Sequence, residues 1–279
     1  MKILVTGSSG LIGMALVESL SRQGHAVTRY NRAQPPELDG FEAVVHLAGK
    51  NIASRWTKAN KQQIYSSRVE LTRQLSTGLA RASHPPRVLI CASAIGFYGD
   101  RGNEMLTEES PSGTGFLTDV VTGWESATAP ASQAGIRVAN LRVGVVLDAQ
   151  QGALAKMLPA FKLGAGGIVG SGRQYWSWVD VADVVGAMEH VLATDSIRGP
   201  VNVVAPNAVT NREFAKTLGR VLHRPTILPL PAAVVKILFG EMSHLLLASA
   251  RVLPVKLEAS GYRFRCPMLD ESLRHLLCR

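Results

Sequence analysis

The sequence predicts an α/β fold, in which a doubly wound parallel sheet carries a smaller, mainly helical C-terminal lobe. Two observations support this prediction. Short apolar runs alternate with helical patterns along the first two thirds of the chain, and a glycine-rich turn joins the first run to the first helix. Strands buried on both faces read as nearly continuous apolar runs, because helices cover both sides of a parallel sheet.

Six apolar segments rich in β-branched residues are the expected strands of this sheet. They are residues 2–6, 26–30, 42–48, 87–93, 136–142 and 201–205. Helical periodicity separates them. In the first helix, Leu11, Ile12, Ala15, Leu16 and Leu20 recur on one face. Residues 57–82 form a long amphipathic stretch that predicts a second helix.

The pattern changes after about residue 150, which suggests a second lobe. Residues 152–184 combine a helix with a glycine-rich loop, and the chain beyond residue 206 is mainly helical. We therefore expect one domain made of residues 1–150 and 181–205, which carries the sheet. Residues 151–180 and 206–279 would form the smaller lobe, which would hold a substrate or a partner.

Composition and charge exclude several classes of protein. The 279 residues are 46% apolar, but no apolar run approaches the roughly 20 residues of a membrane helix. Cys91, Cys266 and Cys278 share no spacing typical of a metal or redox site, so we expect a cytoplasmic protein without a metal. The net charge of +9 is scattered, which fits a solvated basic surface or attraction for phosphorylated small molecules. No basic stretch is interleaved with aromatic residues, so neither nucleic acid nor membrane is an expected partner.

The first turn has the spacing of a dinucleotide-binding site. The segment "TGSSGLIG" follows a strand, opens a helix and places Gly7, Gly10 and Gly13 at intervals of three. In such a turn the first glycine permits a tight bend and the second lets the backbone approach a pyrophosphate. The third lets helix and strand pack closely. Backbone N–H groups and the helix dipole then face the phosphates, so the fold expected here is of the Rossmann type.

The end of the second strand indicates which dinucleotide is bound. NAD-preferring folds place an acidic residue about 20 residues past the glycine turn, against the ribose 2′-hydroxyl. This sequence has Arg29, Tyr30, Asn31 and Arg32 there, and no acid. A guanidinium can clamp a 2′-phosphate with two charge-assisted hydrogen bonds. We therefore predict NADP(H), with Arg32 as the first choice for the 2′-phosphate, Asn31 beside it, and Arg29 either there or facing solvent.

The third strand ends in "HLAG", residues 46–49. Small residues at this edge let the backbone lie beside the adenine-ribose, and Ala48 and Gly49 provide them. His46 has the residue type of a catalytic base. Its position at the end of a buried strand instead favours a packed histidine.

Together these motifs resemble a known family. "TGSSGLIG", "HLAG" and "SAIGFYG" are similar to the extended short-chain dehydrogenase/reductases. "RWT", "SRVELTR", "LPAFKLGAGGIVGSGRQYWSWV", "GEMSHLLLASARVLP" and "GYRFRCPML" narrow the resemblance to an atypical branch. This branch is the epimerase family proteins of the YfcH type, related to NAD-dependent epimerases and dehydratases, with a characteristic C-terminal domain. The resemblance covers essentially the whole chain.

The resemblance implies bound NADP(H) and a set of contact residues. They are Gly7, Ser8, Ser9, Gly10, Leu11, Ile12, Gly13, Asn31, Arg32, Leu47, Ala48, Gly49, Gln63, Arg68 and Val146. Arg68 suits a phosphate, although it could instead pair with Glu70 on the surface. Lys50 departs from the branch, in which a glutamate usually occupies this position.

The larger departure concerns catalysis. Active relatives use a tyrosine followed four residues later by a lysine, which lowers the tyrosine pKa for proton exchange with the substrate. None of the five tyrosines here has a lysine at that spacing. Within residues 115–127, where the resemblance implies the pair, the positions read Leu117 and Val121.

Few polar groups remain as catalytic candidates. Ser93, after the fourth strand, is a candidate to hydrogen-bond a substrate carbonyl, although alignment on "YG" puts the usual serine nearer to Ala94. Tyr98 is a candidate proton donor or a packing residue at the cleft wall. Asp119 and Glu125 lie on the helix that usually carries the pair, where surface acids are also common.

One loop of the second lobe is a candidate to hold a substrate. Residues 170–180 combine flexible glycines, Arg173 and three aromatic residues. An arginine beside aromatic rings suits an anion attached to a flat ring, as in a sugar nucleotide. A hinge with packing tryptophans is the alternative. Asp180 is expected to cap the helix that follows.

Two functions fit the sequence. The first is an NADP(H)-dependent oxidoreductase or sugar-nucleotide-epimerase-like enzyme acting on a small anionic substrate, with hydride transfer supplied by the nicotinamide. The second is a non-catalytic NADP(H)-binding sensor or regulatory protein, which the missing tyrosine–lysine pair favours. The sequence leaves the substrate and the oligomeric state open.

Overall fold

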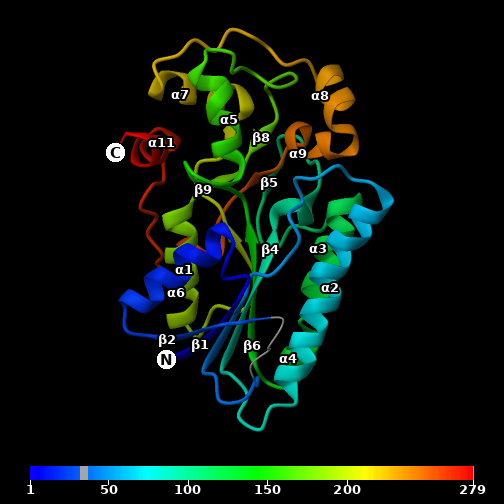
Figure 1. Ribbon diagram of the computed structural model, residues 1–279, viewed down its shortest axis with the longest axis vertical. Coiled ribbons are helices and arrows are strands. Elements are labelled where there is room, and N and C mark those ends of the chain that lie inside the picture. The colour runs from blue at the N-terminus through cyan, green and yellow to red at the C-terminus, as the bar shows by residue number, and fades with distance from the viewer. Residues whose placement is uncertain (32–36, 279) are drawn as a thin grey trace.

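A six-stranded parallel sheet forms the centre of the computed structural model, which describes residues 1–31 and 37–278 (Figure 1). Its strand order is β10-β6-β4-β3-β1-β2. The strands are β1 (Lys2–Thr6), β2 (Ala26–Arg29), β3 (Ala43–His46), β4 (Val88–Ala94), β6 (Arg137–Val143) and β10 (Gly199–Val203). Each expected strand is confirmed within two residues at either end. The predicted doubly wound parallel sheet is therefore confirmed.

Helices cover both faces of this sheet. Helices α1 (Leu11–Arg22) and α6 (Val181–Ala193) lie on one face, and α2 (Lys58–Ala80), α3 (Phe116–Ser126) and α4 (Ala129–Gln133) lie on the other. Side chains alternate between the two cores along each strand. In β1, Ile3 and Val5 join the core under α1 and α6, whereas Leu4 joins the core under α2.

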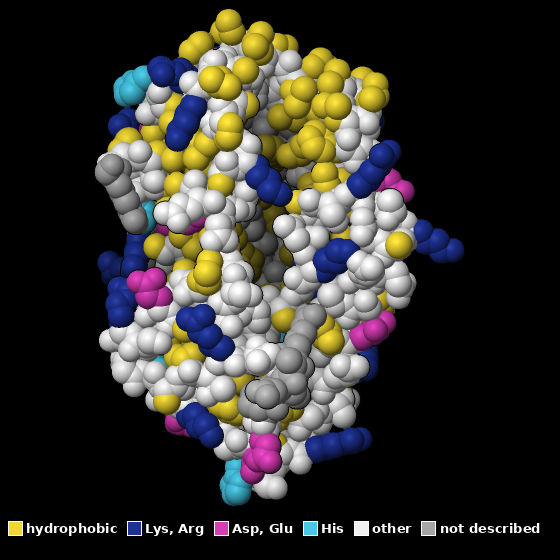
Figure 2. All heavy atoms as spheres, viewed as in Figure 1, with side chains coloured by type: hydrophobic (Ala, Val, Ile, Leu, Met, Phe, Trp, Pro, Cys, Tyr) yellow, Lys and Arg dark blue, Asp and Glu magenta, His cyan; other side chains and the backbone are white. Residues whose placement is uncertain are grey.

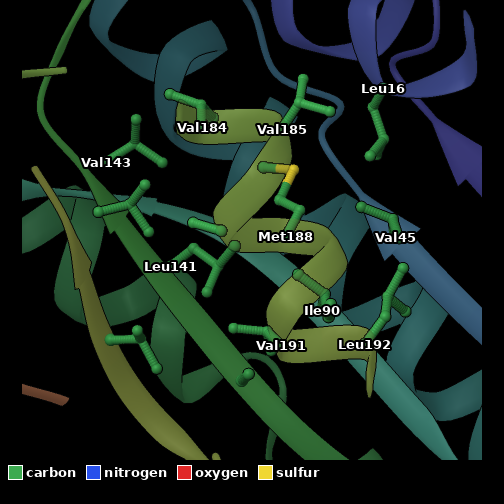
Figure 3. Close-up of a cluster of buried hydrophobic side chains, with 14 of the residues drawn as sticks. Leu16, Val45, Ile90, Leu141, Val143, Val184, Val185, Met188, Val191 and Leu192 are labelled. Carbon is green, nitrogen blue, oxygen red and sulfur yellow. The ribbon is translucent and has the colours of Figure 1, made fainter. Parts of the chain in front are cut away.

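The core beneath α1 and α6 is entirely apolar at its centre. Met188 and Val191 of α6 point toward Ile90 of β4 and Leu141 of β6, and Leu16 of α1 lies beside them (Figure 3). Complete burial of such side chains stabilises the fold by roughly 1.5–3 kcal/mol each relative to exposure. This packing fixes the ends of the strands, where the site is built.

A second apolar cluster lies beyond the carboxyl ends of the strands. It contains buried side chains of α5 (Gly152–Lys162), β8 (Tyr175–Trp176), β9 (Trp178–Asp180), α7 (Asn211–Val221) and α11 (Leu269–Leu277). Segments from 151–180 and from 206–279 thus share one core. Leu257 of α10 (Val255–Ala259) packs instead with the main core. The lobe boundaries given above stay a prediction.

Short elements complete the chain. They are β5 (Met105–Leu106), β7 (Val145–Leu147), β11 (Val209–Thr210), β12 (Arg251–Val252), α8 (Ala232–Phe239), α9 (His244–Leu247) and the 3-10 turns η1 (Ile95–Tyr98) and η2 (Gly240–Ser243). The C-terminal region is mainly helical, as predicted. Within residues 1–31 and 37–278, no helix combines the length and the apolar character that crossing a membrane requires.

Candidate functional site

The site begins at the turn between β1 and α1. Gly7 has a φ of +67°, a conformation that side chains with a Cβ rarely adopt. A Cβ at Gly7 would also lie only 2.6 Å from the carbonyl carbon of Leu47, at the end of β3. Glycine is therefore required at this position for both conformation and space.

The other two glycines of the turn differ from each other. A Cβ at Gly13 would collide with the carbonyl oxygen of Gly7 and lie 2.8 Å from the Cα of Ser8. At Gly10 the nearest atom to an added Cβ would be the Gly7 oxygen, at 3.5 Å. The protein itself therefore requires Gly13, whereas the space beside Gly10 is open to a ligand.

The N-terminus of α1 has the features of an anion-binding site. Its N-cap residue is Gly10, which provides no side-chain cap, and the first turn of the helix contains no acidic residue. The first N–H groups of a helix lack intrahelical acceptors and carry the positive end of its dipole. An anion beside Gly10 can supply both the acceptors and the opposite charge.

The order of the strands places this turn at a crevice. β1 and β3 are neighbours in the sheet, but the helices that follow them, α1 and α2, lie on opposite faces. Open α/β sheets bind ligands in the crevice that such a reversal creates at the carboxyl ends of the strands. Figure 2 shows a hollow in this region that extends upward between α5 and the α8–α9 segment.

The end of β3 is held in place by a buried polar chain. Thr6 Oγ1 is 2.7 Å from His46 Nδ1 and accepts hydrogen bonds from the N–H groups of Leu47 and Ala48. The other ring nitrogen of His46 lies 2.9 Å from Thr72 Oγ1 on α2. His46 is 3% exposed, so it is a packed histidine that positions Leu47 and Ala48 against Gly7.

The end of β2 carries the residues expected at a 2′-phosphate. β2 ends at Arg29, which is exposed, and Tyr30 packs against the core under α2. Asn31 is exposed beyond them. Arg32 lies outside the described residues, so its role stays a prediction from the sequence.

Positive charge gathers beside Gly49. Lys50 Nζ donates to Asn60 Oδ1 at 3.0 Å and to Gln63 Oε1. Arg68 Nη1 donates to the carbonyl oxygen of Lys50 at 2.9 Å. The guanidinium of Arg68 also lies against Gly49. The structure therefore brings Gln63 and Arg68 together with Lys50 at the end of β3.

Arg68 is a cation in a partly desolvated position. Burial lowers the pKa of its guanidinium to about 10. Its planar group lies over the ring of Trp124 on α3, 5.1 Å from the centroid. Among the described residues, no carboxylate lies within ion-pair distance of it, so the pairing with Glu70 considered above is not observed. An anion at this position would stabilise the charged guanidinium and so compensate for the hydration that burial removes.

Val146 lies on the other side of the glycine turn, in β7. A Cβ at Gly152 would lie 3.5 Å from Cδ2 of Leu11 and 3.7 Å from the carbonyl oxygen of Val146. Val146 and Leu11 therefore flank the same glycine at the start of α5. The structure thus brings Val146 close to the start of α1, and its contact with the cofactor stays a prediction.

The positions expected for the catalytic pair face the end of β4. A Cβ at Gly96, in η1, would lie 3.3 Å from Cβ of Leu117 and 3.7 Å from Cγ2 of Val121. Both side chains belong to α3 and both are apolar. Neither a proton donor nor a cation therefore occupies these two positions.

The candidates Ser93 and Tyr98 belong to a buried polar network. Ser93 is 4% exposed, and its hydroxyl donates to Glu125 Oε1 at 2.6 Å. Tyr98 is completely buried and donates to Asn202 Oδ1 at 2.7 Å. Burial raises the pKa of the Tyr98 hydroxyl above its ordinary value. The structure therefore gives both hydroxyls structural partners and does not favour either as a proton donor in the cleft.

Arg142 holds this network together. Its guanidinium makes two hydrogen bonds to the carboxylate of Glu125, at 2.8 and 2.9 Å, and donates to the Tyr98 hydroxyl at 3.0 Å. Glu125 is therefore the partly buried ion-pair partner of a buried arginine, which corrects its interpretation as a surface acid; Asp119, on the same helix, is exposed. Sequence reasoning did not single out Arg142. The available signal was the presence of polar residues, Arg137, Asn140 and Arg142, in a strand expected to be buried.

The loop of residues 170–180 mostly serves packing. Trp176 and Trp178 are buried in the second apolar cluster, and Trp178 Nε1 donates to the Asn207 carbonyl at 3.0 Å. Arg173 is exposed. Asp180 caps α6 through the N–H of Ala182, as expected. The tryptophans pack as in the second alternative. A hinge role of the loop and any contact of Arg173 with a substrate stay predictions.

Comparison with known proteins agrees with this geometry. The parallel sheet, the glycine turn and the crevice define a protein with the short-chain dehydrogenase/reductase fold. Residues 3–204 match the "NAD dependent epimerase/dehydratase family", and residues 230–276 match "Domain of unknown function (DUF1731)". The chain belongs to the NAD-dependent epimerase/dehydratase family, in the branch that carries this C-terminal domain.

Its relatives include proteins from bacteria and animals. The chain is 40% identical over 296 residues to the epimerase family protein Mb2239 of Mycobacterium bovis, covering 99% of this chain and 98% of the relative. It is 35% identical over 293 residues to the human epimerase family protein SDR39U1, covering 99% and 100%.

Solved structures extend the comparison. The crystal structure of human SDR39U1 with NADPH superposes with a TM-score of 0.94 at 34% identity, covering 99% of both chains. The structure of MoeE5 with UDP-glucose and NAD has a TM-score of 0.79 at 20% identity, covering 99% of this chain and 96% of that one. At that identity the likeness concerns the fold alone.

Proposed function

We propose that this chain binds NADP(H) in the crevice between β1 and β3. The cofactor's diphosphate lies against the turn of residues 7–13, where Ser8, Ser9, Leu11 and Ile12 contribute backbone contacts. The open space beside Gly10 is the observation that carries the proposal, because the other two glycines of the turn are already required by the protein's own packing. The human relative solved with NADPH supports the choice of cofactor.

The remaining cofactor contacts follow from the neighbouring strands. Asn31 and Arg32 bind the 2′-phosphate at the end of β2. Leu47, Ala48 and Gly49 line the adenine-ribose side, and Gln63, Arg68 and Val146 close the crevice from both sides. The partly desolvated Arg68 supports this assignment, since an anion would compensate its buried charge.

We infer further that the chain is an NADP(H)-dependent oxidoreductase or epimerase-like enzyme that acts on a small anionic substrate, such as a sugar nucleotide. When bound, the nicotinamide supplies hydride transfer. The chain's own residues orient the cofactor, attract the substrate anion through Lys50, and exclude water with Leu117 and Val121. The protein works in the cytoplasm under this proposal.

A specific observation favours a second candidate function. Because apolar Leu117 and Val121 occupy the positions expected for the catalytic pair, a protein that only binds NADP(H), as a sensor or regulator, also fits the site. One experiment separates the two functions. NADPH is titrated into the purified protein by fluorescence, and NADPH absorbance is then followed with a panel of carbonyl compounds. Sugar nucleotides, the second part of the panel, are incubated separately with the protein and NADP+, and epimerised or oxidised products are detected by chromatography, because epimerisation leaves the net amount of NADPH unchanged.

The outcomes of this experiment are distinct. Binding with turnover of any member of the panel supports the enzyme. Tight binding without turnover supports the sensor. Absence of NADPH binding contradicts both functions.

A further inference from the structure

Helix α8 presents an unusual apolar surface. Ile237 is 82% exposed and Leu238 is 65% exposed, and Val234 on the same helix is also exposed. The segment before the helix adds the exposed side chains of Ile227 and Leu228. Single exposed apolar residues are ordinary, whereas a contiguous group of them marks a binding surface. Figure 2 shows hydrophobic side chains gathered around the upper part of the hollow, where Figure 1 has α8.

This surface continues toward the position of the missing catalytic pair. The chain passes from α8 into η2 and α9, where Met242 and Leu245 pack against the same apolar cluster as Phe116 and Leu117 of α3. All four side chains are only partly buried, so each keeps some exposed surface. We call Phe116, Leu117, Ile237, Leu238, Met242 and Leu245 the apolar strip.

We propose that the apolar strip binds the apolar part of an amphiphilic substrate, whose reacting carbonyl or hydroxyl group lies at the inner end, beside Leu117. This inference rests on the proposed enzymatic function and specifies its substrate class as an anion that bears an alkyl chain or an apolar ring system.

Two observations support a small-molecule occupant. The inner half of the strip is partly buried between α3 and the η2–α9 segment, a position that a narrow chain reaches and a flat partner surface does not. Arg68 lies on the ring of Trp124, which belongs to the same helix as Leu117 but is two turns, roughly 10 Å, farther along it. Lys50 lies beside Arg68, so positive charge for an anionic group is available on the same side of the crevice as the inner end. Farther out, Lys61 pairs with Glu241, which neutralises charge beside the strip.

A homologous series of ligands tests the proposal. The probes are pyruvate, 2-oxohexanoate and 2-oxodecanoate, which keep the carbonyl and the carboxylate constant while the alkyl chain grows. Binding to the NADPH-loaded protein is measured by calorimetry, and NADPH oxidation is measured separately. The dissociation constant should fall by about fourfold for each methylene that is fully buried.

Variants locate the effect on α8. Ile237→Ser and Leu238→Ser should each weaken binding of 2-oxodecanoate by about tenfold and leave the dissociation constant of pyruvate unchanged. Because both side chains are exposed, folding should be unaffected, and thermal unfolding checks this. Val255→Ser on α10 is the matched control, since Val255 is an exposed apolar residue on a helix that packs against the edge strand β10.

Three outcomes would overturn the proposal. The first is an affinity that does not depend on chain length. The others are a dimer, or binding to anionic vesicles, that Ile237→Ser abolishes while 2-oxodecanoate binding is unchanged. Chain-length-dependent binding without NADPH oxidation would support the strip as a ligand site and would count against the enzymatic function alone.

Discussion

Alanine substitutions at Gly10 and Gly13 test whether each glycine of the first turn is needed for cofactor binding or for the packing of the protein itself. Gly10 has φ −80° and ψ 168°, which an alanine adopts without strain, and an added Cβ would approach protein atoms no closer than 3.5 Å. Loss of unfolded-state entropy favours the alanine by about 0.4–1 kcal/mol, and its poorer N-cap preference offsets part of this gain. We therefore expect Gly10→Ala to change the free energy of unfolding by less than about 1 kcal/mol.

Its effect on the cofactor should be much larger. A methyl group beside the N-terminus of α1 would occupy the space proposed for the diphosphate and displace at least one charge-assisted hydrogen bond. Such a bond contributes about 1.5–3 kcal/mol, so the dissociation constant of NADPH should rise about ten- to a hundred-fold. Gly13→Ala should instead act mainly on stability. It should lower the free energy of unfolding by about 1–3 kcal/mol, because its Cβ meets fixed backbone.

The assays are urea denaturation of the apoprotein and fluorescence titration with NADPH, applied to both variants and the parent. Unchanged NADPH affinity in a folded Gly10→Ala protein would refute the reasoning, since the space beside Gly10 would then hold no phosphate. A Gly10→Ala protein that is as unstable as Gly13→Ala would also contradict the structural distinction between the two glycines.

Three further predictions concern other parts of the molecule. Arg32→Asp should weaken NADPH binding about ten- to a hundred-fold more than NADH binding in competitive titrations, with Arg22→Asp, an exposed arginine in the last turn of α1, as the control; equal losses for the two cofactors would exclude a 2′-phosphate contact. Glu125→Ala should destabilise the protein by about 3–5 kcal/mol in urea denaturation, because it leaves a buried arginine without its partner. Asp119→Ala on the same helix should cost no more than about 1 kcal/mol, and equal costs would contradict the buried ion pair. A thiol reagent should modify one cysteine rapidly in the native protein and none after Cys278→Ser, because burial raises the pKa of the other two thiols; two fast thiols would contradict this.

Much of the fold could be predicted from the sequence because its signals are local. The strands of the main sheet are apolar runs bounded by turns, and the positions of Gly7, Gly10 and Gly13 reflect backbone geometry within one short segment. The two-residue strands, such as β5 and β12, were not predicted. They are too short to show periodicity and exist only because distant segments pair.

The buried network could not be predicted for a related reason. Glu125 and Arg142 are ordinary charged residues in sequence, and their pairing depends on α3 lying across the end of β6. For Trp176 and Trp178 the sequence offered packing only as one of two alternatives, and the choice depends on α7 and α11, which bury them in one cluster. Tertiary packing therefore decided which candidate side chains serve structure, whereas the cofactor turn was encoded locally.

The most direct test of the account is a crystal structure of this protein grown with millimolar NADPH. The account predicts the diphosphate within hydrogen-bond distance of the backbone N–H groups of residues 7–13, with the 2′-phosphate beside Arg32. An empty crevice under these conditions, or a cofactor bound elsewhere on the molecule, would contradict it.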